Sequence, residues 1–153
     1  MRRFALLSAL ALAACGGSSA PPSSVSPSES PDAAVTSFLR AVKDSNLTAM
    51  SQLWGTAEGS AAETKKPDQW ERRVELMQIY LNHDAARVVA SGPETGGGEN
   101  RHKVTVELAR AGCIRHVPFT VVRRNRGGWV VNEIELTAAG NPAKGCLPRP
   151  SGN

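Results

Sequence analysis

The sequence is poor in the residues from which metal and catalytic sites are commonly built. Its 153 residues include three cysteines, three histidines and one tyrosine. A zinc site needs several ligands at suitable spacing. No such pattern is formed by His83, His102, Cys113 and His116. We therefore predict no metal site, no cofactor and no catalytic residue.

Long hydrophobic runs and a strong excess of one charge are also missing. The apolar run Phe4–Ala14 covers 11 residues, whereas a membrane-spanning helix needs about 20. A retained anchor helix is therefore disfavoured. The formal net charge is +4, and it falls to +2 without residues 1–14, which hold two of the 18 basic residues and no acidic one. This excess is too small to indicate a nucleic-acid partner.

The start of the chain carries a targeting segment. Arg2 and Arg3 precede the apolar run, and the residues Leu-Ala-Ala-Cys end it at Cys15. This arrangement resembles the lipobox of bacterial lipoproteins, in which a peptidase cuts before the cysteine and its thiol and amine are acylated. The resemblance implies a signal peptide over residues 1–14 and lipidation at Cys15. The alternative is an ordinary cleaved signal with an incidental cysteine.

A linker and one domain follow the signal. Residues 15–31 comprise the acylated cysteine and a Ser/Pro-rich linker, which cannot bury enough apolar surface to fold. A single domain is expected over residues 32–150. The lipobox implies the bacterial cell envelope, facing the periplasm or the exterior. In some bacteria an aspartate directly after the acylated cysteine acts as a retention signal. Here that position is Gly16, which favours the outer membrane over the inner.

The first half of the domain has the period of amphipathic helices. The first helix starts at Pro31 behind the candidate N-cap Ser30. Its apolar face comprises Val35, Phe38, Leu39 and Val42. A second helix is predicted over residues 47–54, and its apolar face comprises Leu47, Met50, Leu53 and Trp54. A mobile polar loop is predicted over residues 56–66. A third helix is predicted from Pro67 to Asn82, with an apolar face made of Trp70, Val74, Met77 and Leu81.

The second half alternates with a period of two, as half-buried strands do. Strands are predicted over residues 86–91, around 104–108, 114–124 and 129–136, with a hairpin turn at 125–128. Pro118 cannot donate to a ladder and indicates an edge or a bulge. In the last strand one face is assigned to Val130, Ile134 and Leu136, and the other to Trp129, Val131 and Glu133. The expected fold is α+β, with N-terminal helices packed on a curved antiparallel sheet of about four strands.

Three segments carry a family resemblance: residues 31–39 (PDAAVTSFL), residues 44–47 (DSNL) and residues 127–134 (GGWVVNEI). Over about residues 31–137 the chain resembles the cone-shaped domains of the nuclear transport factor two superfamily, which includes ketosteroid isomerase-like enzymes and many bacterial lipoproteins. The resemblance implies a curved sheet enclosing a pocket that serves catalysis, small-ligand binding or dimerisation. Fold alone does not choose among these functions.

The enzymatic members use a pocket tyrosine and carboxylates as oxyanion hole and base. Here Tyr80 lies near a helix end and Asp84 follows that helix, so the catalytic set does not map onto this chain. If a pocket exists, we expect Tyr80, His116 and Trp129 to line it.

Two cysteines remain once Cys15 is acylated. In an oxidising compartment Cys113 and Cys146 are expected to form a disulfide; two free thiols are the alternative. An arginine run at residues 123, 124 and 126 is interpreted as a solvated turn, the alternative being attraction to lipid phosphates or an acidic partner.

The sequence therefore predicts a membrane-anchored lipoprotein whose domain binds a small ligand or an envelope protein without catalysis. Two alternatives stay open. A ketosteroid isomerase-like enzyme requires a buried carboxylate or histidine with a shifted pKa inside the pocket. An interaction scaffold requires an interior filled with side chains and an exposed apolar patch.

Overall fold

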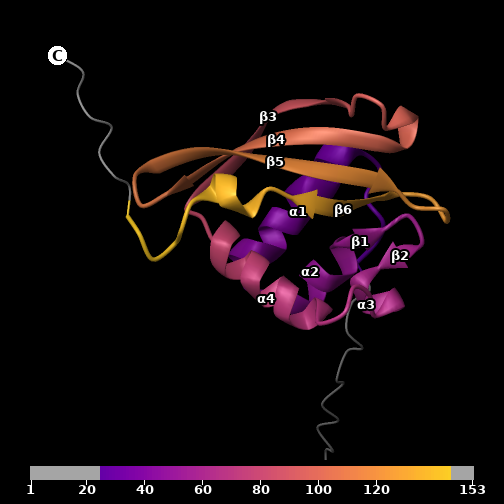
Figure 1. The fold of residues 1–153 in the computed structure, drawn as a ribbon, viewed down its shortest axis with the longest axis horizontal. Coiled ribbons are helices and arrows are strands. Elements are labelled where there is room, and N and C mark those ends of the chain that lie inside the picture. Colours follow the sequence, from indigo (N-terminus) through magenta and orange to yellow (C-terminus); the bar gives the residue numbers. More distant parts are fainter. Residues whose placement is uncertain (1–24, 146–153) are drawn as a thin grey trace, which may run out of the picture.

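A computed structural model describes residues 25–145, which fold as helices followed by a four-stranded antiparallel sheet (Figure 1). The predicted α+β class is confirmed. The predicted signal peptide, Cys15 and Cys146 lie outside the described residues, so the structure does not test predictions about them.

The first two helices follow the predicted pattern closely. Helix α1 spans Pro31–Lys43, and the Ser30 hydroxyl accepts a hydrogen bond from the Ala33 amide at 3.2 Å. Its predicted apolar face is buried. Helix α2 spans Leu47–Leu53 behind the N-cap Asn46. Leu47 departs from the prediction, because at the first turn of α2 it stays 38 % exposed.

The predicted loop over residues 56–66 is wrong, because that segment is folded. Strands β1 (Gly55–Thr56) and β2 (Gly59–Ser60) form a small ribbon, and helix α3 (Ala61–Thr64) follows. A capping box starts α3: the Ser60 hydroxyl accepts from the Glu63 amide, and the Glu63 carboxylate accepts from the Ser60 amide. The spacing of Ser60 and Glu63 is the sequence signal that could have shown this helix.

Helix α4 spans Trp70–Leu81 and starts three residues later than predicted. Gln69 has a φ of 58°, a left-handed conformation that a helix interior does not accept. Of the predicted apolar face, Val74, Met77 and Leu81 are buried and Trp70 is half-buried.

The sheet has the strand order β3-β4-β5-β6. Its strands span Ala85–Pro93, Arg101–Arg110, Cys113–Arg123 and Trp129–Ile134. Two short 3₁₀ helices accompany them: η1 (Gly98–Asn100) and η2 (Leu136–Ala139). The last strand is therefore shorter than predicted, and Leu136 belongs to η2.

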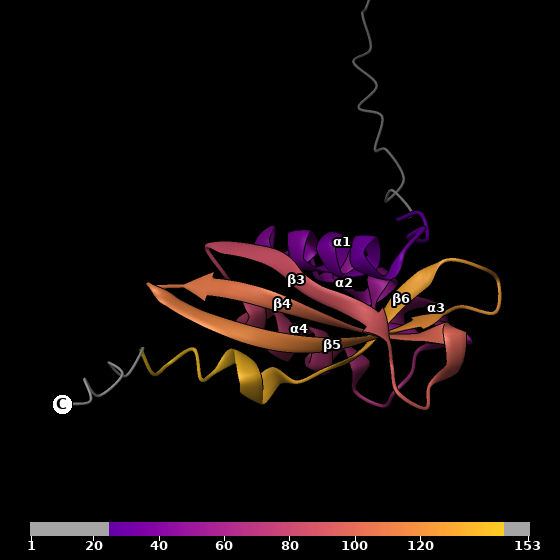
Figure 2. The same ribbon diagram turned by 90° about the horizontal axis from the view of Figure 1, so that it is seen from above.

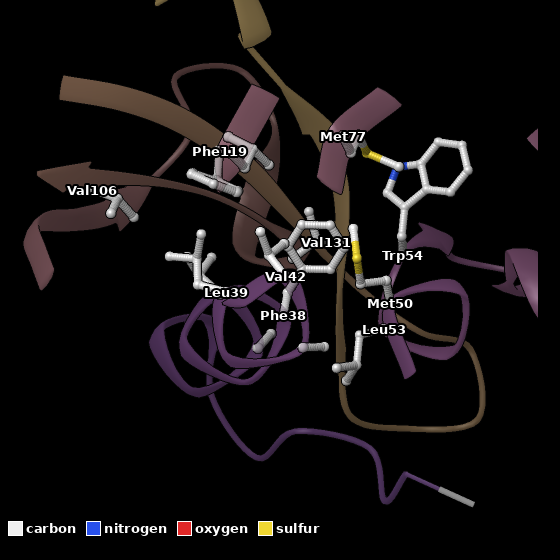
Figure 3. Close-up of a cluster of buried hydrophobic side chains, with 14 of the residues drawn as sticks. Phe38, Leu39, Val42, Met50, Leu53, Trp54, Met77, Val106, Phe119 and Val131 are labelled. Carbon is white, nitrogen blue, oxygen red and sulfur yellow. The ribbon is translucent and has the colours of Figure 1, made fainter. Parts of the chain in front are cut away.

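Helices cover one face of the sheet. Helix α1 contacts all four strands from β3 to β6, and Figure 2 shows it lying along the sheet. Figure 3 shows the Phe38 ring within the cluster of buried side chains, with Met50 and Val131 beside it and Trp54 at the margin near Met77. The core lies between the helices and this face of the sheet.

A bulge at Asn132 changes which residues of β6 face the core. Thr120 pairs with Glu133 but Val121 pairs with Val131, so Asn132 has no opposite residue. The predicted faces of β6 are therefore wrong, since Ile134 pairs with core residue Phe119 and shares the inner face with Val131.

Pro118 lies at a local edge of the interior strand β5. It pairs with Thr105 of β4, whereas β6 ends at Ile134 before reaching it. Its carbonyl accepts from the Glu135 amide at 3.0 Å. Within an extended strand the N–H and C=O of one residue point toward the same neighbouring strand. The N–H that Pro118 lacks would therefore point to the side on which β6 has already ended. The predicted edge or bulge is confirmed in this local sense.

The end of the expected linker is part of the fold. Ser28 is 8 % exposed and its carbonyl accepts from the Trp129 amide at 2.9 Å. The Val25 amide donates to the Gln52 side chain at 3.1 Å. A Cβ on Gly128 would lie 2.4 Å from the Pro27 Cβ, so this glycine permits the close approach. The folded region therefore begins before residue 32.

Candidate functional site

The space between the helices and the sheet is filled with side chains. Phe38, Met50, Leu81 and Phe119 are all less than 2 % exposed and occupy this region. The family resemblance implies a cone-shaped pocket there. In residues 25–145 the candidate site is instead an open groove at the margin of this core.

This groove, called the α4 groove below, lies between α4, β6 and η2 and has a volume of about 270 Å³. Its apolar surface comes from Trp54, Leu76, Met77, Ile134 and Leu136. Its polar groups come from Arg73, Asn132 and Glu133. An apolar lining with a few polar groups is typical of binding sites.

Hydrogen bonds around the bulge hold one wall of the groove in place. The Trp54 indole N–H donates to the Asn132 carbonyl at 2.9 Å. The Asn132 side-chain amide donates in turn to the Gly55 carbonyl at 2.7 Å. The extra residue in β6 thereby joins the strand to α2 and β1. Because Trp54 is only 8 % exposed, it presents a fixed edge to the groove.

Helix α4 supplies the exposed part of the site. Leu76 lines the groove and is 46 % exposed, and Ile79 of the same helix is 52 % exposed. A helix packed by one face normally places polar residues at such positions. The leucine and isoleucine outside the buried stripe of α4 are the sequence signal for this surface, and sequence reasoning missed it.

The structure does not bring the three predicted pocket residues together. Trp129 packs against the core on the helix-covered face, and its ring meets His102 edge-on at a centroid distance of 5.0 Å. His116 precedes the buried Val117 on β5 and so points to the opposite face, with its side chain 62 % exposed. Tyr80 is half-buried near the end of α4, outside the α4 groove. The α4 groove replaces the predicted pocket.

The histidines are spread over the fold. His83 is buried, with Nδ1 2.8 Å from the Leu81 carbonyl oxygen, and lines a different groove between α1 and β3. His116 Nε2 lies 3.7 Å from Glu107 on the outer face of the sheet. In the part of the chain that the structure describes, no three His, Cys, Asp or Glu residues gather as a metal-binding set.

Cys113 begins β5 and lines a small cavity of about 80 Å³. Gly145, the neighbour of Cys146 in sequence, lines the same cavity. This placement is compatible with the predicted disulfide, whose second cysteine lies outside the described residues. The pairing stays a prediction.

Neither a protein-family model nor a curated protein matches this chain. None of the helices within residues 25–145 is long and apolar enough to cross a membrane. The function is therefore inferred from the sequence pattern at Cys15 and from the geometry of the α4 groove.

Proposed function

We propose that this protein is a lipid-anchored component of the bacterial envelope that binds an apolar segment of another envelope protein in the α4 groove, without catalysis. The anchoring part of the proposal rests on the lipobox resemblance around Cys15. The binding part rests on the groove. Membrane attachment would hold the domain near envelope partners and raise their effective concentration.

The observation that carries the binding proposal is the exposed Leu76 beside an apolar groove. The Met77 and Ile134 side chains continue the apolar surface of Leu76 into the fold. Covering this surface would remove apolar area from water, which is favourable at roughly 25 cal/mol per Å². A filled interior with apolar side chains left outside is the arrangement expected of an interaction protein.

The size of the groove favours a protein side chain over an enclosed small molecule. Its volume of about 270 Å³ is near the lower end of the roughly 300–1,000 Å³ of typical small-molecule sites, and those sites enclose most of their ligand, whereas this groove is open. One or two large apolar side chains fill such a space, and interface anchors commonly insert in this way. Arg73, Asn132 and Glu133 offer charges and amide groups to the polar groups flanking an inserted side chain.

Photo-crosslinking in cells tests the proposal. A photoreactive phenylalanine analogue replaces Leu76 in the full chain, and the matched control carries it in place of Val89 on β3, which is 39 % exposed and lies outside the groove. We expect a discrete protein crosslink from position 76 and none from position 89. Adding Ile134→Ala should reduce the crosslink, whereas Ile114→Ala, an exposed residue outside the groove, should leave it unchanged.

Equal crosslinking from both positions, or a crosslink indifferent to Ile134→Ala, would refute binding in the groove. Native mass spectrometry of the intact protein separates the small-ligand alternative, which requires an adduct that disappears on denaturation. The anchor is tested by Cys15→Ala, which we expect to release the protein from the membrane fraction. Unchanged fractionation and mobility of that variant would contradict lipidation.

A further inference from the structure

A second groove lies at the turn between β5 and β6. It is lined by Asn100, Arg123, Arg124, Asn125 and Gly127, and its volume is about 370 Å³. We call it the hairpin groove; the β5–β6 turn that contributes to it lies at the end of the sheet next to the β1–β2 ribbon (Figure 1). All its side chains are polar, and both charged ones are arginines, so it suits an anion.

The two arginines differ in their surroundings. Arg123 is exposed, and no hydrogen bond or ion pair holds its side chain among the described residues. The Arg124 side chain is only 12 % exposed, and its Nη2 donates to the Glu63 carboxylate at 2.8 and 3.1 Å. Its Nε is buried and has no hydrogen-bond partner within residues 25–145. A buried donor without an acceptor is costly, and the side chain that carries it lines the hairpin groove.

The hairpin groove is next to the segment that leads to the proposed anchor. Pro27 packs against Gly128, and Ser28 bonds to Trp129, both directly after the turn. Nine residues, 16–24, separate Cys15 from Val25. Even fully extended, nine residues reach only about 32 Å. An acylated Cys15 therefore keeps this end of the domain within a short distance of the lipid surface.

We propose that the hairpin groove binds phosphate groups of anionic phospholipids in the membrane that carries the anchor. The inference rests on the lipidation of Cys15 in the proposed function, but not on the α4 groove. Guanidinium groups match phosphate oxygens with paired donors, and the Asn100 and Asn125 amides supply further donors. Glu63 limits the site, because its carboxylate already occupies one nitrogen of Arg124.

Vesicle co-sedimentation tests the site. The mature chain, residues 15–153, carries Cys15→Ser so that no acyl chain contributes. We expect it to bind vesicles of equal parts phosphatidylglycerol and phosphatidylcholine, and not vesicles of phosphatidylcholine alone. Arg123→Gln should lower the partition coefficient about fivefold. Glu63→Gln should raise it, because Arg124 gains a free donor while glutamine still serves the capping box.

The matched control is Arg115→Gln, which removes the same charge from an exposed position on the same strand. Positions 115 and 123 are about 27 Å apart at the usual strand rise. An equal loss from both variants would show attraction by net charge alone and overturn the site. Binding of inorganic phosphate by a chain that does not bind the phosphatidylglycerol vesicles would identify soluble phosphate as the ligand and overturn it too.

The two proposals fail separately. Absence of vesicle binding by the Cys15→Ser chain removes the headgroup site and leaves the crosslinking and fractionation results untouched. Retention of Cys15→Ala in the membrane fraction with unchanged mobility would refute the proposed lipid anchor, whatever the result of the vesicle experiment.

Discussion

The α4 groove is lined mainly by apolar side chains, whereas the hairpin groove is lined by polar ones. The first is a continuation of the core: Trp54 is 8 % exposed and Met77 is 4 % exposed, and both also line the groove. The second is polar, and its Arg124 side chain is held by an ion pair with Glu63. Binding residues are therefore tied to stability at the α4 groove and are largely independent of it at the hairpin.

The largest expected difference between the grooves is in the cost of truncating one wall residue. Trp54→Ala removes a buried indole and its hydrogen bond to Asn132, and should lower the free energy of unfolding by about 3–5 kcal/mol. Arg124→Ala should cost less than about 1 kcal/mol, because its partner Glu63 is 52 % exposed. Urea denaturation of the two variants measures both values.

The control is Trp70→Ala, whose half-buried ring lies outside the α4 groove and packs under Lys65 Nζ at 5.1 Å. The decrease in the free energy of unfolding for Trp70→Ala should fall between the decreases for Trp54→Ala and Arg124→Ala. If Arg124→Ala proves as destabilising as Trp54→Ala, the contrast between a core-built and a surface-built groove is lost.

A smaller effect is expected at the bulge that shapes the α4 groove. Asn132→Ala removes the donor to the Gly55 carbonyl and should cost about 1–3 kcal/mol. The bond from Trp54 goes to the Asn132 main chain and is retained. Asn125→Ala is the same substitution in the hairpin groove, where the main-chain amide of Asn125 bonds to Ala57. Thermal melts should show a clear loss for Asn132→Ala and almost none for Asn125→Ala; equal losses would argue against a special role for the bulge.

The smallest expected effect is the pH dependence of the stability that Glu63, the ion-pair partner of Arg124 in the hairpin groove, contributes. The pKa of Glu63 is lowered from its ordinary value of 4.5, chiefly because the Ser60 amide donates to its carboxylate, with help from the Ser60 hydroxyl and Arg124. A lowered folded-state pKa contributes stability above pH 4.5 that is lost as the pH falls through the folded-state pKa. We expect the native chain to exceed Glu63→Gln in stability at neutral pH by less than about 1 kcal/mol. The difference should shrink on acidification, and urea midpoints across the acid range measure it; a gap that grows in acid would contradict this account.

Much of the helical layer was predictable because its signals are local. Ser30 caps α1, and the buried Phe38 and Val42 repeat at helical spacing. The capping box of Ser60 and Glu63 was equally local but was hidden among small polar residues. Strand positions followed from alternation up to Asn132, where the bulge exchanged the two faces of β6.

The candidate site was less predictable, because its residues come from distant segments. Trp54, Leu76 and Ile134 meet only when α2, α4 and β6 pack together. The predicted pocket residue His116 faces away from the helices, since its neighbour Val117 is buried on the other side of β5. The alternation of Val117 and Phe119 already placed His116 on the face opposite the apolar side chains, and the pocket prediction did not use it.

The sequence by itself determined the order of helices before strands and the apolar face of α1, and it carries the pattern at Cys15 on which the proposed lipidation rests. These depend on short-range spacing, which chain geometry converts directly into one face of a helix or strand. Only the tertiary structure decided that the interior is filled, that Leu76 borders an open groove, and that Arg124 lies beside Glu63 and close to the linker. Those features depend on which distant surfaces bury each other, and that is settled by packing of the whole domain.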